Sequence, residues 1–347
     1  MGMQNKMNTK KLLTPQEEQA LKPYQLSDGK GLTIKVLAFG GIISSITLKE
    51  QELSLGYDDL SLYLDDPFYL GASVGRYANR INQGVFSLNN HEYTVTKTPG
   101  EHCLHGGEQG FNKCIWQVIY HHKDEIKLYL HTPDGDGGFP GNVDVWQTIS
   151  VADNQIKISF EASSDKDTVL NLTNHCYFNL NNDESLIDNH YLQLFSQHYL
   201  PTDKEGIPTG DIKPTFGSCL NFNEPTQLKA VLSDQHEQIL LANGIDHCFT
   251  LDNDESTHNL NGKVGINNRL AAKLTSPQSN ITLSLFTSLP GVQVYTGNYL
   301  ATPFKKNQGV CLEAQFWPDA PNNDSFPSTV LLANEKFNQE IIYAFNN

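Results

Sequence analysis

Two polar residues lie inside apolar stretches of this 347-residue chain, and both are types that transfer protons. Glu313 follows the apolar residues 310–312 and precedes Pro318, where a strand would have to end. A carboxylate buried at a strand end has a raised pKa, which suits a general base or acid. Taken alone, however, Glu313 is better explained as an edge residue in a surface salt bridge.

The second residue, His175, lies in the segment 170–180, whose polarity alternates as it would in a strand. The opposite face would carry leucines, a phenylalanine, Cys176 and Asn174. The face of His175 has no aliphatic side chain, and its other members are Asn171, Thr173, Tyr177 and Asn179. Such a face suits the wall of a cleft for a hydroxyl-rich ligand, and a solvent-exposed strand face explains it equally well.

A third candidate, His105, is followed by Gly106 and Gly107, which indicate a tight turn or a close approach of backbone to ligand. His102 lies three residues earlier, a spacing that could suggest a metal. With no third ligand nearby and no helix to align the pair, we expect no metal site here. The alternative for His105 is a structural hydrogen bond in a loop.

Further polar residues occur where burial is expected. Asn79 and Arg80 place an amide beside a guanidinium, a pairing suited to sugar oxygens. Asp246 follows a glycine turn and could accept two vicinal hydroxyls, or simply cap the turn. Gln293 shares a predicted strand face with Tyr295. Aromatic residues that could stack on a sugar ring, although such residues usually belong to a β-protein's core, are Trp116, Phe139, Phe316 and Trp317.

The strands that would position these residues follow from a dominant period of two, as in 143–151, 156–160 and 281–285. Asn89-Asn90 and Asp153-Asn154 are predicted hairpin turns. Residues 14–17 have the capping chemistry of a helix start, and 233–239 could form another short helix.

We therefore predict an all-β protein, with residues 25–347 as one domain. Residues 1–24 would be poorly ordered or loosely attached. The stretch 252–268, rich in Asn and Asp, would be a long loop, with no function assigned to either segment.

The overall charge narrows the function classes. Lys and Arg total 24 against 39 Asp and Glu, a net charge of −15, which argues against nucleic-acid binding. No apolar run is long enough to span a bilayer, and the first residues lack the apolar core of a secretory signal. Six cysteines without a C-x-x-C pair fit free thiols in the cytoplasm.

Taken in order along the chain, these segments resemble the aldose 1-epimerase (galactose mutarotase) family. The matching motifs run from about residue 25 to the C-terminus, and eight in series are specific where any one would be weak. They include Gly75-Arg-Tyr-Ala-Asn-Arg-Ile81, Leu104-His-Gly-Gly107, Thr173-Asn-His-Cys-Tyr-Phe-Asn-Leu180, Pro290-Gly-Val-Gln-Val-Tyr-Thr-Gly-Asn298 and Leu312-Glu-Ala-Gln315.

The resemblance implies a large twisted antiparallel β-sandwich whose concave face holds a free sugar such as galactose or glucose. It implies Glu313 as general base and His175 as general acid. Arg80 and His105 would bond the ring oxygen and nearby hydroxyls, and the remaining hydroxyls would bind to Asp246, Asn79 and Gln293. No cofactor or metal is needed, because a base and an acid suffice to open and reclose a hemiacetal.

Ordinary pKa values of about 4.3 for Glu and 6.5 for His would leave the two groups in opposite charge states over a workable pH range. Arg80 is expected to lower the pKa of His175 and so make it a readier acid. The sequence leaves open which aldose is preferred and whether the protein is a monomer or a homodimer.

Three other functions compete with this one. A hexose-6-phosphate 1-epimerase of the same fold would need more Arg or Lys at the cleft, and the chain has only three arginines. A glycoside hydrolase could use Glu313 and Asp246 as a carboxylate pair, which would have to lie about 5–9.5 Å apart. A non-catalytic sugar-binding protein would be expected to lose Glu313 or His175.

Overall fold

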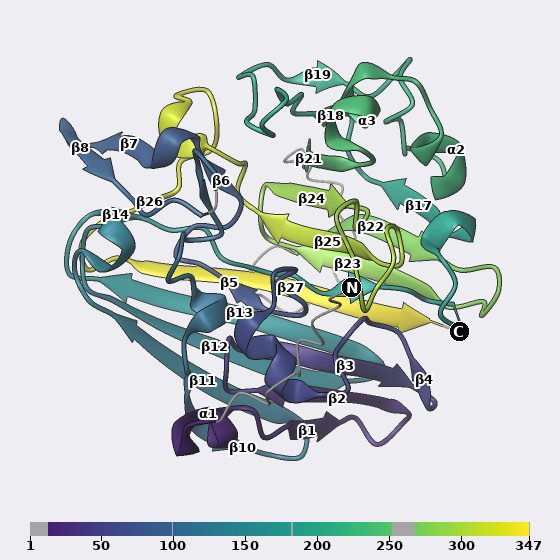
Figure 1. The fold of residues 1–347 in the computed structure, drawn as a ribbon, viewed down its shortest axis with the longest axis horizontal. Coiled ribbons are helices and arrows are strands. Elements are labelled where there is room, and N and C mark those ends of the chain that lie inside the picture. The colour runs from purple at the N-terminus through teal and green to yellow at the C-terminus, as the bar shows by residue number, and fades with distance from the viewer. Residues whose placement is uncertain (1–12, 99, 182, 252–267, 347) are drawn as a thin grey trace, which may run out of the picture.

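The computed structural model describes residues 13–98, 100–181, 183–251 and 268–346, and most of them form antiparallel sheets (Figure 1). The largest sheet has nine strands. Strand β27 lies in the middle of this sheet, between β13 and β23. Its strands in spatial order are β10 (Gln117–His121), β11 (Glu125–Thr132), β12 (Val143–Ala152), β13 (Gln155–Ser164), β27 (Lys336–Asn346), β23 (Thr282–Thr287), β22 (Arg269–Thr275), β17 (Tyr191–Leu194) and β20 (Thr226–Gln227).

A six-stranded sheet and a four-stranded sheet pack near the first. The six strands in spatial order are β16 (Tyr177–Phe178), β25 (Val310–Gln315), β24 (Gly291–Tyr295), β21 (Asp246–Thr250), β18 (His198–Tyr199) and β19 (Lys213–Pro214). The four are β1 (Tyr24–Ser27), β2 (Leu32–Leu37), β3 (Ile42–Leu48) and β4 (Gln51–Glu52).

Short pairs and helices complete the described fold. The pairs are β5 (Ser73–Val74) with β15 (Thr173–Asn174), β6 (Arg80–Ile81) with β9 (Cys103–Leu104), β7 (Val85–Leu88) with β8 (His91–Thr94), and β14 (Thr168–Val169) with β26 (Val330–Leu331). The α-helices are α1 (Pro15–Ala20), α2 (Leu228–Leu232) and α3 (Glu237–Ala242), and the 3₁₀ turns are Leu60–Asp65, Asn82–Gly84, Phe111–Lys113, Asp136–Gly138, Ile187–Asn189 and Ala320–Asn322. None of the described helices has the length and apolarity to cross a membrane.

The predicted all-β sandwich is confirmed, and its core explains the period of two. In β12 and β13 every second residue is buried, so one face of each strand packs inward. One apolar cluster joins Val145 and Ile158 of the large sheet to Val294 and Leu312 of the six-stranded sheet. Because each fully buried aliphatic side chain contributes about 1.5–3 kcal/mol, this cluster holds the two layers together.

Local sequence signals also hold. Asn89-Asn90 and Asp153-Asn154 adopt left-handed backbone in the turns of β7–β8 and β12–β13. Thr14 and Glu17 form the reciprocal capping box at the start of α1.

Part of the predicted loose segment 1–24 packs against the fold, since Ala20 is buried and its carbonyl accepts the N–H of Phe39. Residues 1–12 and nearly all of the predicted loop 252–268 lie outside the described residues.

Two local predictions were wrong. The segment 170–180 is not one strand, because β15 pairs with β5 and β16 pairs with β25, with His175 between them. Both of its faces are buried, so the exposed-face explanation fails. Helix α3 begins at Glu237 rather than near 233, because the chain first completes α2 and caps the next helix with the His236 side chain.

Two buried histidines of the fold make its stability depend on pH. His190 accepts the Leu180 N–H on Nε2 at 2.9 Å, and His247 accepts the Asp246 N–H on Nδ1 at 3.2 Å. Burial lowers the pKa of His190 to about 4 and that of His247 to about 3. Protonation in the folded state would break these bonds and bury a charge.

We predict that the melting temperature falls as pH drops from about 6.5 toward 4. The folded pKa values lie below the unfolded value, so this stability is present above pH 6.5 and is lost with acid, at roughly 1 kcal/mol per pH unit for each histidine. Calorimetry of His190→Gln should give a shallower slope, whereas exposed His122→Gln should match wild type. An unchanged slope in His190→Gln would contradict the assignment.

Candidate active site

Three neighbouring strands bring the central residues together. In the six-stranded sheet, Glu313 of β25 is in register with Gln293 of β24, and Asp246 of β21 is in register with Tyr295 of β24. On the other side of β25, β16 places Tyr177 opposite Cys311, two residues after His175. Rigid strands therefore fix Glu313, Gln293 and Asp246 relative to one another.

A cavity of about 360 Å³ opens over these strands. Its lining combines a few polar groups with aromatic rings, as in sites for small polar ligands. The lining residues are Pro67, Phe68, Tyr69, Asn79, Arg80, Leu104, His105, His175, Tyr177, Asp246, Tyr295, Tyr299 and Glu313. Six of the seven predicted site residues thus meet at one cavity, and the seventh, Gln293, bonds to Asp246.

The two predicted catalytic residues face each other. Nε2 of His175 lies 3.6 Å from Oε1 of Glu313, and the two side chains are only 5% and 2% exposed. Burial raises the pKa of Glu313 well above its usual value, with a further upward contribution from Asp246 and a downward one from Arg80. Burial lowers the pKa of His175 to about 4. Glu313 is therefore neither at a sheet edge nor in a surface salt bridge.

Two electrostatic expectations were wrong. The ordinary order of the pKa values is reversed, so burial favours a neutral carboxylic acid beside a neutral imidazole. The low pKa of His175 comes from burial, partly offset by the histidine's own backbone carbonyl, and not from Arg80. Arg80 acts instead on Glu313 and on His105, and it lowers the pKa of both.

His105 is oriented as a hydrogen-bond donor to the cavity. Its Nδ1 accepts the backbone N–H of Asn79 at 3.2 Å. Burial, followed by the neighbouring His175 and Arg80, holds the pKa of His105 well below its usual value, so the ring is neutral. A neutral ring that accepts on Nδ1 carries its proton on Nε2.

The Nε2–H tautomer of His105 also bears on whether His105, His175 and Glu313 could bind a metal ion. Their ligand atoms lie within 4.8 Å of one another, close enough to suggest a metal site. A metal needs a nitrogen lone pair from each histidine, and Nε2–H of His105 offers none. The donor set therefore fits a polar ligand better than a metal ion.

Asn79 precedes the short strand β6, which begins at Arg80, and another segment packs on the Arg80 side chain. Asn79 adopts left-handed backbone, and its Oδ1 accepts the N–H of Arg80 at 2.9 Å. Gly206 packs against the guanidinium, where a Cβ would lie 2.9 Å from Cζ. The φ of +79° at this position favours glycine, because L side chains rarely adopt that conformation. Arg80 is thereby held at the cavity with limited freedom.

Gln293 and Glu313 each have a buried side-chain oxygen without a protein partner. Nε2 of Gln293 donates to Oδ1 of Asp246 at 2.6 Å. Oε1 of Gln293 and Oε2 of Glu313 are buried without a protein partner. Buried polar atoms without partners are costly, so these two oxygens indicate a ligand or water that donates to them.

Tyr69 is a cavity residue that the sequence did not reveal. Its ring centroid lies 4.6 Å from that of His105 and 5.8 Å from that of His175. Its backbone is left-handed, with φ of 59°, which is rare for a bulky residue and persists only where the surroundings impose it. Asp66 imposes it by accepting the N–H groups of Phe68 at 3.0 Å and Leu70 at 2.7 Å.

Other candidates belong to the fold instead. Arg76, in the same motif as Arg80, is buried and donates to the carbonyls of Pro140 and Gly141. Among the aromatics considered for sugar stacking, Trp116 and Phe139 are buried in apolar clusters, and Trp317 packs on Phe326. The rings at the cavity are tyrosines and Phe68.

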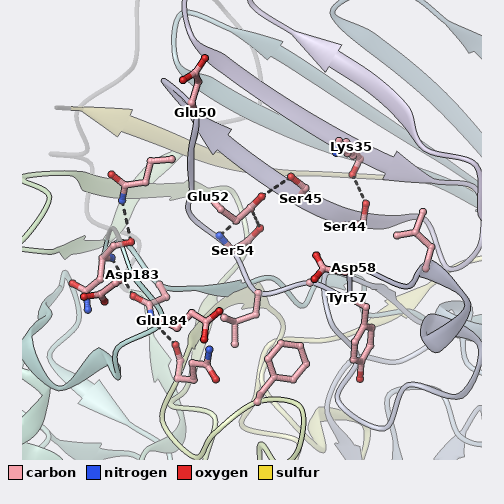
Figure 2. A pocket seen from close by; sticks show the side chains of 18 of the residues that line it. Lys35, Ser44, Ser45, Glu50, Glu52, Ser54, Tyr57, Asp58, Asp183 and Glu184 are labelled. Carbon is pink, nitrogen blue, oxygen red and sulfur yellow. Dashed lines mark hydrogen bonds between the residues drawn. The ribbon is translucent and has the colours of Figure 1, made fainter.

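A larger groove of about 820 Å³ lies elsewhere, beside β3 and β4 (Figure 2). Its lining includes the labelled carboxylates Glu50, Asp58, Asp183 and Glu184, and no histidine. Lining polar groups that are buried, such as Ser54 and Asn179, already have protein partners. Among the described residues, the cluster of two histidines with a buried glutamate lies at the smaller cavity.

Comparisons with known proteins agree with this geometry. The aldose 1-epimerase family model matches residues 22–344. The chain belongs to the aldose 1-epimerase family. It is 32% identical to the galactose mutarotase of Homo sapiens, over 91% of each chain, and 32% identical to the aldose 1-epimerase of Escherichia coli K12, over 88% of this chain and 90% of that one.

Solved structures give the same result. An aldose epimerase homologue from C. elegans superposes with a TM-score of 0.86 at 29% identity, covering 94% of this chain and 99% of the other. A galactose 1-epimerase from Lactobacillus acidophilus gives a TM-score of 0.82 at 26% identity, covering 93% of each chain. This family member is therefore an isomerase that interconverts the anomers of an aldose.

We predict that Asp66→Ala weakens sugar binding, because the Tyr69 ring that lines the cavity would no longer be held in place. Two backbone N–H groups and the Tyr57 hydroxyl would lose their acceptor, at a cost of about 1–3 kcal/mol in stability. Mutarotation kinetics should show a raised KM with a smaller change in kcat. Exposed Asp58→Ala serves as control. A wild-type KM in Asp66→Ala would mean that Asp66 supports only the fold.

Proposed function

We propose that this epimerase opens and recloses the ring of a free aldose, with Glu313 as general base and His175 as general acid. The proposal is carried by the 3.6 Å separation of Oε1 and Nε2 inside a buried cavity. At that spacing both groups can reach the two oxygens bonded to C1 of one sugar.

The reaction begins with the closed ring, Glu313 ionised and His175 protonated. Glu313 takes the proton of the C1 hydroxyl while Nε2 of His175 gives one to the ring oxygen. The C1–O5 bond breaks and C1 becomes an aldehyde carbonyl. After rotation about C1–C2, O5 attacks the other face of C1, its proton returns to His175, and Glu313 returns a proton to O1. All protons and bonds are restored, with the opposite anomer.

Burial of the pair favours the ring-opening step. In the open-chain complex Glu313 is a carboxylic acid and His175 a neutral imidazole, which are the forms that burial favours. The closed-ring complex must hold the charged forms in the same low-dielectric space. From the charged closed-ring complex, the proton transfers of ring opening therefore lead to the pair of protonation states that burial favours.

The remaining residues would hold the sugar in place. Arg80 and Nε2–H of His105 supply donors for the ring oxygen and nearby hydroxyls. Asp246, with Asn79 and the free Oε1 of Gln293, supplies acceptors and a further amide for the other hydroxyls. We propose galactose or glucose as substrates, since relatives named galactose mutarotase match most of the chain.

The cavity favours a free aldose over a hexose phosphate. Among the described residues that line it, Arg80 is the only arginine or lysine, and Asp246 and Glu313 add acidic groups. A phosphate would have to bind beside these carboxylates with a single guanidinium to neutralise it.

The six cysteines are free thiols, which supports a reducing compartment such as the cytoplasm. The predicted monomer or homodimer can be checked by sedimentation.

Removing the base should abolish catalysis. We predict that Glu313→Gln lowers kcat by about 10²–10⁴-fold, the usual contribution of a positioned acid or base. The assay follows the optical rotation of freshly dissolved α-D-galactose and subtracts the spontaneous rate. Exposed Glu161→Gln is the matched control and should behave as wild type. Retention of most activity by Glu313→Gln would refute the assignment.

The pair should give a bell-shaped dependence of kcat/KM on pH, because catalysis requires one proton shared between Glu313 and His175. Acid adds a second proton and removes the base, near the His175 pKa of about 4. Alkali removes the last proton and with it the acid, at a pH well above the ordinary pKa of glutamate.

Asp246→Asn provides the test of that upper limb. Because the Asp246 charge raises the Glu313 pKa, its loss should move the alkaline limb to lower pH. Asp58→Asn should leave both limbs in place. An alkaline limb already near pH 4.5 in the wild type would contradict the buried, raised pKa of Glu313.

A further inference from the structure

One strand reaches both ring nitrogens of His175. Cys311 and Glu313 are two residues apart in β25, so their side chains point to the same face of the six-stranded sheet. Glu313 lies 3.6 Å from Nε2, and the sulfur of Cys311 lies 3.5 Å from Nδ1. β25 thus sets the position of the imidazole on both sides.

The backbone of His175 is fixed independently of its ring. Its N–H donates to the carbonyl of Ala72 at 2.9 Å, and its own carbonyl accepts the N–H of Gly71 at 3.0 Å. Rotation of the side chain about its bonds is what remains to be controlled. The titratable groups that face the ring from neighbouring elements are Glu313, Cys311, His105, Tyr69, Tyr177 and Tyr295.

Cys311 is a neutral partner. It is fully buried, and burial together with the nearby Glu313 raises the pKa of its thiol well above the usual value. It therefore stays a thiol throughout the working pH range, and its sulfur is a weak hydrogen-bond acceptor.

We propose that Cys311 is a positioning residue for the epimerase reaction, whose sulfur accepts Nδ1–H of His175 and leaves Nε2 as the nitrogen that exchanges the proton. This inference rests on the proposed role of His175 as general acid. Nδ1 keeps its proton through the cycle, while Nε2 gives one to the ring oxygen and later recovers it. A ring turned away from Cys311 would present the wrong nitrogen to the sugar.

The weakness of the thiol serves the chemistry. In Ser-His-Asp triads an aspartate at Nδ1 stabilises the imidazolium, which suits a histidine that must take a proton. His175 must give a proton to the weakly basic ring oxygen, so strong stabilisation of its imidazolium would slow the step. A neutral sulfur orients the ring without that penalty.

A competing partner is the backbone carbonyl of His175 itself, which also favours a protonated ring. If that carbonyl orients Nδ1 unaided, the thiol contributes only packing. The two possibilities are separated by replacing Cys311 and following the pH dependence rather than activity alone.

The test compares Cys311→Ser, Cys311→Ala and Cys311→Asp by kcat, KM and pH profile. Ser should keep the wild-type profile, since its oxygen also accepts Nδ1–H. Ala should lower kcat by about 10-fold with little change in KM, in the lower range for loss of a residue that orients a functional histidine. Asp should raise the acid limb by about 1–3 pH units and lower kcat, because a carboxylate stabilises the imidazolium.

Cys176→Ala is the matched control, since Cys176 is equally buried, adjacent to His175 in sequence, and packed in the main apolar core. It should lose stability without shifting the acid limb. If Cys311→Ala loses only stability, with unchanged kcat and pH profile, the positioning role is overturned. Failure of the proposed function would appear separately, as retained activity in Glu313→Gln.

A measurement on the wild type covers the case in which the variants do not fold. Nitrogen NMR of histidine-labelled protein near neutral pH should show His175 as the neutral Nδ1–H tautomer. A neutral Nε2–H tautomer would overturn the proposal, because Nδ1 would then have no proton for the sulfur to accept.

Discussion

The proposed chemistry depends on the burial of two ionisable groups against each other with one proton between them. Water would separate Glu313 and His175 electrostatically and restore their ordinary pKa values. When water is excluded, burial raises the pKa of Glu313 and lowers that of His175. A neutral carboxylic acid beside a neutral imidazole is then the more stable pair. In the proposed reaction this is the charge state of the open-chain complex, and the rest of the protein keeps the two side chains buried and 3.6 Å apart.

The architecture meets this requirement by dividing the work between strands and loops. Glu313, Gln293 and Asp246 come from three adjacent strands, whose spacing and register are fixed by the backbone hydrogen bonds of the sheet. Arg80 begins the short strand β6, whereas His105 and Tyr69 come from connections; each lies against or next to a neighbouring segment through a specific bond or contact. All three have or adjoin left-handed backbone, which is tolerated because these contacts impose it.

The sequence predicted which polar residues gather at the cavity better than it predicted their local structure. Glu313 and His175 could be singled out from the sequence because the alternation of apolar and polar residues predicts which side chains are buried, and both are polar residues in such segments. The motif series then supplied their roles. The hairpins and the capping box were predictable because their signals are local. The break at His175 was not visible, because pairing of β15 and β16 with different partners is decided by distant segments.

Tyr69 and Cys311 escaped detection for related reasons. An aromatic residue near a motif and a cysteine inside an apolar run both resemble core residues, and only tertiary contacts give them another role. The reversal of the pKa order could not be derived from the sequence either. It depends on how completely the two side chains are removed from solvent, which is a property of the assembled layers rather than of either strand.

The position of β27 has a consequence for how the protein is made. This strand lies between β13 and β23, so the nine-stranded sheet is split until residues 336–346 are available (Figure 1). Contacts so distant in sequence carry a high entropic cost and form slowly. During synthesis the two halves of the sheet would wait with open edges, which are prone to pair with other chains. The cavity, assembled from segments between residues 67 and 313, lies on a scaffold whose largest sheet closes only when residues 336–346 are in place.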